Sequence, residues 1–396
     1  MRIISVISGA FLLVSVVLGQ GGATGQSWDD VVAKARNGEV YWHAWGGSPA
    51  INDYIAWVAD RVADDYDITL NHVKIADTAN VVKAIAAEKD AGRTQGGLID
   101  LMWINGENFH RLKREELLLG PIQDLPALQF VDTDRFAYDF AVATDGLEVP
   151  WGQARLIFIH DSANTQAPPK SIADFLPYAK QHPGRITYPP PPEFIGTTVL
   201  KQILLSLHED ITVFQKPPGD DADTHLAVLW EFLDDLHPLM WREGEAFPEN
   251  ENNMRYLLDN GEIDIAMSFN VGAVSTAIDR GLLPATARSY VLEEGTLGNA
   301  HYLAIPFNAA NEHAAKVVIN FLLSPEAQAH KQHPLNWGDP SVLDFNLMDK
   351  AGQKAFAAIP DDPAVLTLAD LGPSFAEPHV EWVELIEERW LQRYQK

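Results

Sequence analysis

The chain has 396 residues, a length that fits two domains of ordinary size better than one small core. Its formal net charge of −26 argues against a nucleic-acid partner, because phosphate binding needs a basic face, and it also disfavours an anionic membrane surface. The absence of cysteine excludes disulfides, thiolate metal sites and catalytic cysteines.

The N-terminal segment predicts export. Arg2 supplies a positive start, residues 3–18 form an apolar run, and residues 19–26 are small and polar. This is the layout of a secretory signal peptide, and the apolar run is short for a membrane span. We therefore expect residues 1–26 to be a signal peptide, with an uncleaved anchor as the alternative. Because no cysteine follows the run to accept a lipid, the predicted location is the periplasm.

The first part of the mature chain alternates strands with helices. Apolar spacing predicts strands at 39–45, 68–75 and 98–104, separated by helices that begin near Pro49 and Thr78. A strand–helix–strand–helix–strand order requires parallel pairing with right-handed crossovers. This block is therefore predicted to be an α/β domain.

A second α/β block follows Pro150. Strands are predicted at 156–159, 185–188 and 263–269, and a strand at 302–305 returns toward the first block. The predicted helices of this half lie at 172–181, 196–207, 224–237, 250–259 and 271–280, then from Asn311 and from Ser324, and finally at 379–394.

Two groups of residues carry a resemblance to a known family. Residues 314–328, AAKVVINFLLSPEAQ, resemble the FLLSPEAQ segment of extracellular solute-binding proteins, at the late position where that family places it. Residues 42–47, WHAWGG, and 103–109, WINGENF, are similar to the YnjB-like branch, which is related to polyamine-, thiamine- and iron-binding proteins. The resemblance covers essentially the whole mature chain.

The resemblance implies a type II periplasmic-binding-protein fold. Two α/β lobes, each with a mixed and mostly parallel sheet flanked by helices, would be joined by crossing hinge strands. The expected first lobe combines residues 27–150 and 300–396, and the expected second lobe spans 151–299. The implied role is a monomeric subunit that captures a small solute in the interlobe cleft and passes it to a membrane permease with a cytoplasmic ATPase. No P-loop occurs in this chain, and no cofactor is expected.

Ligands of open α/β sheets lie beyond the carboxyl ends of the strands, and this rule selects the candidate ligand-binding residues. Tryptophan offers a flat face, asparagine donates and accepts, and glycine permits close approach. The candidates are Trp45, Gly46, Gly47, Ser48, Asn105, Gly106, Glu107, Asn108 and Trp151 from the first lobe and its boundary, and Gly196, Thr197, Ser268 and Asn270 from the second. The alternative is structural: the tryptophans would be core residues, the glycines would form turns, and 196–198 would cap a helix.

Glu107 is the most informative single candidate. A carboxylate in a cleft lined by tryptophan suits an organic cation, such as a thiamine- or polyamine-like solute, whereas a solvated loop charge is the alternative. A neutral or anionic solute held at helix N-termini stays open.

Other functions are less favoured. A secreted metal-dependent hydrolase would need a motif such as HExxH, which is absent, and His330 and His333 lack a further ligand nearby in the sequence. Iron-binding relatives use adjacent tyrosines, and this chain has no Tyr-Tyr pair. We therefore predict no catalytic and no metal-binding residue.

Overall fold

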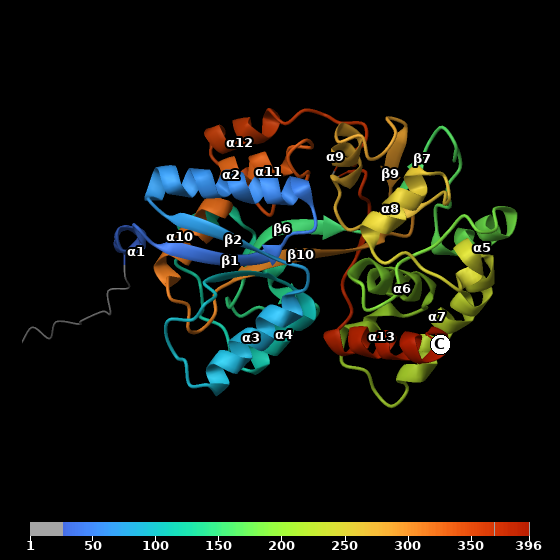
Figure 1. Cartoon of the computed structure of the whole chain (residues 1–396), viewed down its shortest axis with the longest axis horizontal. Helices are drawn as coiled ribbons and strands as arrows, with labels where there is room; N and C mark the ends of the chain where they lie inside the picture. Colours follow the sequence, from blue (N-terminus) through green and yellow to red (C-terminus); the bar gives the residue numbers. More distant parts are fainter. Residues whose placement is uncertain (1–26, 368, 396) are drawn as a thin grey trace, which may run out of the picture.

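Two hydrophobic cores divide the chain into two lobes (Figure 1). The computed structural model describes residues 27–367 and 369–395, so the predicted signal peptide lies outside the described residues. Within these ranges, no helix combines the length and apolar character that a membrane span needs.

The first lobe is built on a mixed sheet in the order β2–β1–β3–β10–β6. Strands β1 (Glu39–Trp45), β2 (Thr69–Ile75) and β3 (Leu101–Ile104) run parallel, and β10 (Thr296–Ala304) joins antiparallel to β3. The helices around this sheet are α1 (Trp28–Ala35), α2 (Pro49–Tyr66), α3 (Thr78–Asp90), α4 (Gly106–Arg114), α10 (Glu312–Leu322), α11 (Pro325–Gln332) and α12 (Lys350–Ala357).

Local sequence explains why these elements begin where they do. Pro49 occupies the first turn of α2, where its missing N–H has no helical partner to lose. The Asp77 side chain accepts from the N–H of Ala79 at the start of α3, and the Ser324 hydroxyl accepts from the N–H of Ala327 at the start of α11.

The second lobe has a smaller sheet in the order β8–β7–β9, in which both pairs are antiparallel. The expectation of a mostly parallel sheet in each lobe is therefore wrong for the second lobe, and parallel pairing among the main strands is confined to the first. Its strands are β7 (Ile157–Asp161), β8 (Ala266–Ser268) and β9 (Ala287–Tyr290), and its helices are α5 (Ile172–Gln181), α6 (Phe194–Leu207), α7 (Ala222–Leu236), α8 (Glu251–Asp259), α9 (Ala273–Asp279) and α13 (Val380–Tyr394).

The prediction of a strand at 185–188 is wrong. These residues join no sheet, because their backbone bonds go to separate segments: the Arg185 carbonyl accepts from Asp264 N–H at 2.8 Å and the Ile186 carbonyl from Trp241 N–H at 2.8 Å.

Two long strands cross between the lobes. Strand β6 (Val149–Arg155) pairs antiparallel with β10, and this ribbon lies between the two bodies in Figure 1. A third connection leads from α12 to α13 and includes β11 (Ser374–Phe375), which pairs with β10. The short remaining elements are β4 (Tyr138–Asp139), β5 (Val142–Ala143), and 3-10 turns at Pro126–Phe130, Thr133–Phe136, Ile211–Gln215, His237–Leu239, Trp241–Gly244 and Phe345–Leu347.

The C-terminal helix belongs to the second lobe. Its residues Trp382, Ile386 and Trp390 are buried in the second core, and Figure 1 shows α13 beside α6 and α7. The expectation that residues 300–396 all return to the first lobe is therefore wrong for this last part. The sequence pattern marks the apolar stripe of α13 but not the helix against which that stripe packs.

Candidate functional site

Trp151 lies in an aromatic cluster at the start of the crossing ribbon. Its side chain is fully buried, and its ring makes edge contacts with Trp42, Trp103 and Trp337, with centroids 5.4, 5.2 and 5.3 Å away. Such contacts stabilise a core beyond the area they bury. Trp151 thus occupies the core position given as its structural alternative, and it has no surface to offer a solute.

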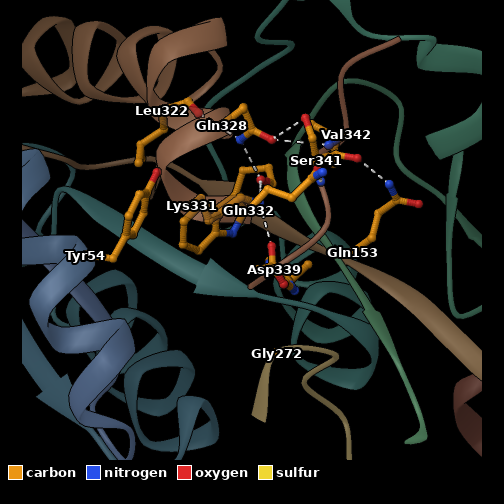
Figure 2. Close-up of polar contacts among 12 residues, drawn as sticks. Tyr54, Gln153, Gly272, Leu322, Gln328, Lys331, Gln332, Asp339, Ser341 and Val342 are labelled. Atoms are coloured by element: carbon orange, nitrogen blue, oxygen red, sulfur yellow. Dashed lines mark hydrogen bonds and ion pairs between the residues drawn. The ribbon is translucent and has the colours of Figure 1, made fainter. Parts of the chain in front are cut away.

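A buried polar network fixes this part of the ribbon to α11, as Figure 2 shows. The Gln328 side chain donates to the Trp151 and Leu322 carbonyls, both at 2.8 Å. Lys331 Nζ donates to the Trp151 carbonyl and to Asp339 Oδ2, each at 2.5 Å. Because these groups are buried, each depends on the others for its hydrogen bonds.

The loop after β1 keeps an exposed aromatic face. Trp45 is 38% exposed, and its ring lies against Gly47, where a Cβ would be 2.3 Å from the ring. The Gly46 N–H donates to Ile75 and its carbonyl accepts from Asn52, so this backbone is held firmly. Ser48 stands at the N-cap of α2 without using its side chain for capping. Trp45 and Ser48 therefore retain groups that a solute could contact.

The loop after β3 makes a close turn at Gly106. Its φ of +57° and a Phe140 ring 3.0 Å from any Cβ both require glycine. The Gly106 N–H donates to Asp139 Oδ2 at 2.5 Å. Asn105 is the N-cap of α4 without a side-chain capping bond, and the neighbouring Asn108 is half-buried.

Glu107 lies in the first turn of α4, on the side that faces the second lobe. Burial of its carboxylate and repulsion from Glu387 raise the pKa of Glu107 to about 7, and the positive charge of Lys201 opposes this rise. Glu107 is nevertheless an exposed residue, so its side chain is not fully enclosed by the protein.

The N-terminus of α6 is not free to hold an anion. Helix α6 begins at Phe194, two residues earlier than predicted, and the Glu193 carboxylate accepts from the Gly196 N–H at 2.9 Å. The Thr197 hydroxyl donates to Glu387 Oε1 at 2.6 Å, on the facing helix α13. Gly196 thus has a capping role, and Thr197 positions a carboxylate.

Ser268 and Asn270 shape the turn that follows β8. Ser268 is fully buried, and its hydroxyl accepts from the Asn270 N–H at 3.1 Å. The Asn270 side chain in turn accepts from the Gly272 N–H at 3.0 Å. Their polar atoms are therefore engaged in hydrogen bonds that stabilise this turn.

Sequence reasoning missed a lysine between the lobes. Lys201 Nζ pairs with Glu377 Oε2 at 2.6 Å, with both side chains buried, and lies 4.8 Å from the Phe140 ring and 5.9 Å from the Phe194 ring. Phe140 packs on Gly106 of the first lobe, whereas Phe194 begins α6 of the second. The signal available in the sequence was a lysine that is the only charged residue in helix α6, because a buried charge needs a partner.

A cavity of about 910 Å³ lies against the crossing ribbon. Its walls come from β6, β10, residues 135–141 and the third connection at 371–377, and none of the predicted site residues lines it. Arg135 and Arg155 both face this cavity.

The lobes also meet directly on the side of α2 and α9. Arg280 Nη2 and Asp53 Oδ2 are 2.8 Å apart across the gap. Gly272 approaches the backbone of Trp337 and Gly338 so closely that a Cβ would lie 2.2 Å from the Trp337 carbonyl oxygen. The two lobes are therefore in direct contact on this side.

Two α/β lobes joined by a paired crossing ribbon have the type II periplasmic-binding-protein fold, which confirms the predicted fold class. Residues 56–335 match the bacterial extracellular solute-binding proteins, and the chain belongs to this family. It is 43% identical over 371 residues to Protein YnjB of Escherichia coli (strain K12), covering 93% of this chain and 94% of that protein. The resemblance to the YnjB-like branch is thereby confirmed.

Solved structures with low sequence identity share the fold. The spermidine/putrescine ABC transporter substrate-binding protein PotD from Streptococcus pneumoniae strain Canada MDR_19A superposes with a TM-score of 0.61 at 17% identity, covering 90% of this chain and 99% of that one. AfuA from Actinobacillus pleuropneumoniae, with fructose-6-phosphate bound, gives 0.63 at 14% identity, with coverage of 90% and 99%. These structures show the shared fold, and the family match makes the chain an extracellular solute-binding protein. Among its described residues, no group of three or more His, Asp or Glu side chains is placed to hold a metal ion.

Proposed function

We propose that this chain is the substrate-binding subunit of an ABC importer that captures an organic cation between its lobes and delivers it, unchanged, to an inner-membrane permease. The observation that supports the proposal is a meeting of carboxylates across the gap: Glu107 of α4 faces Glu387 and Glu384 of α13. The named relatives do not decide the charge of the solute, because they include both a spermidine/putrescine protein and a sugar-phosphate complex.

Repulsion between these carboxylates links capture to closure. Glu107 belongs to the first lobe and Glu387 to the second, so bringing the lobes together brings like charges together. Lys201, whose charge lowers the pKa of Glu107, is already paired with Glu377. A cation between Glu107 and Glu387 would be attracted to both, and the closed form would gain stability when the solute is bound.

Cation binding should depend on pH in a defined direction. A cation favours the ionised form of Glu107, whose pKa is raised to about 7, so protonation below that pH opposes binding. Affinity for spermidine or thiamine should therefore rise by roughly tenfold between pH 6 and pH 8. Isothermal titration calorimetry at constant ionic strength measures this rise, and mass spectrometry of the released solute shows whether it returns intact.

Glu107→Gln should remove most of this pH dependence and weaken binding. Glu388→Gln is the matched control, because Glu388 lies on α13 with an exposed side chain and is not among the groups that shift the pKa of Glu107. A flat pH profile in the parent protein, or equal affinity for neutral sugars, would contradict the cationic solute.

A further inference from the structure

The cavity against the crossing ribbon has an unusual charge for so acidic a chain. Arg155, on β6, donates from Nη1 to the carbonyls of Thr296 at 3.0 Å and Pro373 at 2.7 Å. Arg135 Nη2 donates to Gln153 Oε1 at 2.5 Å, and Gln153 itself donates to the Ser341 carbonyl, as Figure 2 shows. Both arginines line the cavity, and Gln153, which holds Arg135, lies two residues before Arg155 on β6.

Neither arginine has an acidic partner. Within residues 27–367 and 369–395, no carboxylate forms an ion pair with Arg135 or Arg155, and Arg155 Nη2 makes no hydrogen bond. The two groups are close enough to influence one another: burial, and then the charge of Arg135, lower the pKa of Arg155. Arg155 is half-buried and Arg135 is exposed, so Arg155 loses solvent without gaining a carboxylate partner, even in a chain with a net charge of −26.

The acidic residues that line the same cavity do not supply the missing charge. Glu377 is neutralised by Lys201 at 2.6 Å. Burial raises the pKa of Asp139 to about 8, so that this side chain is largely protonated at neutral pH. The charge left in the cavity is therefore that of the two arginines.

We propose that this cavity is a binding site for a small anion, a carboxylate or a phosphoryl group held by Arg135 and Arg155. Guanidinium groups bind such oxygens through paired, charge-assisted hydrogen bonds. Arg155 contacts β10 and the third connection, and Arg135 stands on the first lobe, so a bound anion joins segments that lie on either side of the hinge. The cavity adjoins the Glu107 region, because its lining residue Asp139 accepts from the Gly106 N–H, but the anion proposal rests on the two arginines and does not depend on the cationic solute.

Calorimetric titration of the mature chain with inorganic phosphate and with succinate, at ionic strength held constant with sodium chloride, tests the site. We expect saturable binding of at least one probe. A response to phosphate alone identifies a phosphoryl site, a response to succinate alone identifies a carboxylate site, and both responses support the shared chemistry.

Arg135→Gln should weaken that binding at least tenfold. Arg135 is exposed and its side chain bonds only to Gln153, so this variant should fold; Arg155→Gln tests the second group, with its melting temperature as a folding check. Arg389→Gln, which removes an exposed guanidinium paired with Asp223, should bind like the parent. Absence of saturable binding for both probes, or equal binding by the parent and Arg135→Gln, overturns the site. Spermidine titration of the same variants reports separately on the proposed cation, because Glu107 is intact in them.

Discussion

Asp339→Ala should lower the free energy of unfolding by about 3–5 kcal/mol, the usual cost of removing one partner from a buried ion pair. Lys331 is fully buried, and its Nζ lies 2.5 Å from Asp339 Oδ2. Burial already lowers the pKa of Lys331, and the charge of Asp339 opposes that shift. Without the carboxylate, Lys331 would keep the Trp151 carbonyl as its acceptor but lose its counter-charge.

The loss of stability caused by Asp339→Ala should be concentrated at the crossing ribbon. Asp339 Oδ2 also lies 3.2 Å from His301 Nε2, on β10, so that one carboxylate connects α11 to the ribbon. Because a two-lobed chain need not unfold in one step, urea titration should be combined with hydrogen exchange of β6 and β10. Faster hydrogen exchange in these two strands would show that the stability is lost at the crossing ribbon.

A matched pair in the same lobe provides the control. Lys316 and Asp124 are 3.1 Å apart with more exposed side chains, and Asp124→Ala should cost no more than about 1 kcal/mol. Lys331→Met combined with Asp339→Ala should recover part of the loss, since it removes the stranded charge. Equal costs for Asp339→Ala and Asp124→Ala would contradict the role given to the buried pair.

The order of elements in the first lobe could be predicted because it follows from local spacing. Strand β1 and helix α2 carry their apolar residues at periods of two and about 3.6, and Pro49 marks where the helix begins. The element against which an apolar stripe packs cannot be predicted from local spacing. The stripe of α13 is as regular as that of α2, yet only the folded chain shows that it packs in the second lobe.

The candidate site was predictable only in part, for the same reason. Trp45 and Trp151 both lie on strands, but Trp45 is exposed at the end of β1, whereas Trp151 is enclosed by three further tryptophans. Glu107 was found because it lies just beyond the carboxyl end of strand β3. Its counterpart Glu387 is almost 300 residues away in sequence, and no spacing rule joins the two.

Gly272→Val should prevent the lobes from closing fully while leaving each lobe folded. A side chain at Gly272 would place Cβ 2.2 Å from the Trp337 carbonyl oxygen and 2.6 Å from Gly338 Cα. Both neighbours are backbone atoms, so that no side-chain rotation relieves the overlap. The other contact on this side, Arg280 with Asp53, is more exposed, and Arg280→Ala should cost less than about 1 kcal/mol.

Small-angle scattering separates loss of closure from loss of folding. The parent protein should become more compact with saturating solute, whereas Gly272→Val should keep the larger radius of gyration and bind at least roughly tenfold more weakly, which corresponds to about 1.4 kcal/mol of closure energy. Gly219→Val, on an exposed loop of the second lobe, is the control and should close normally. If Gly272→Val became as compact as the parent, the Gly272–Gly338 approach would not be part of the closed state, and closure would have to depend on the facing helices α4 and α13 alone.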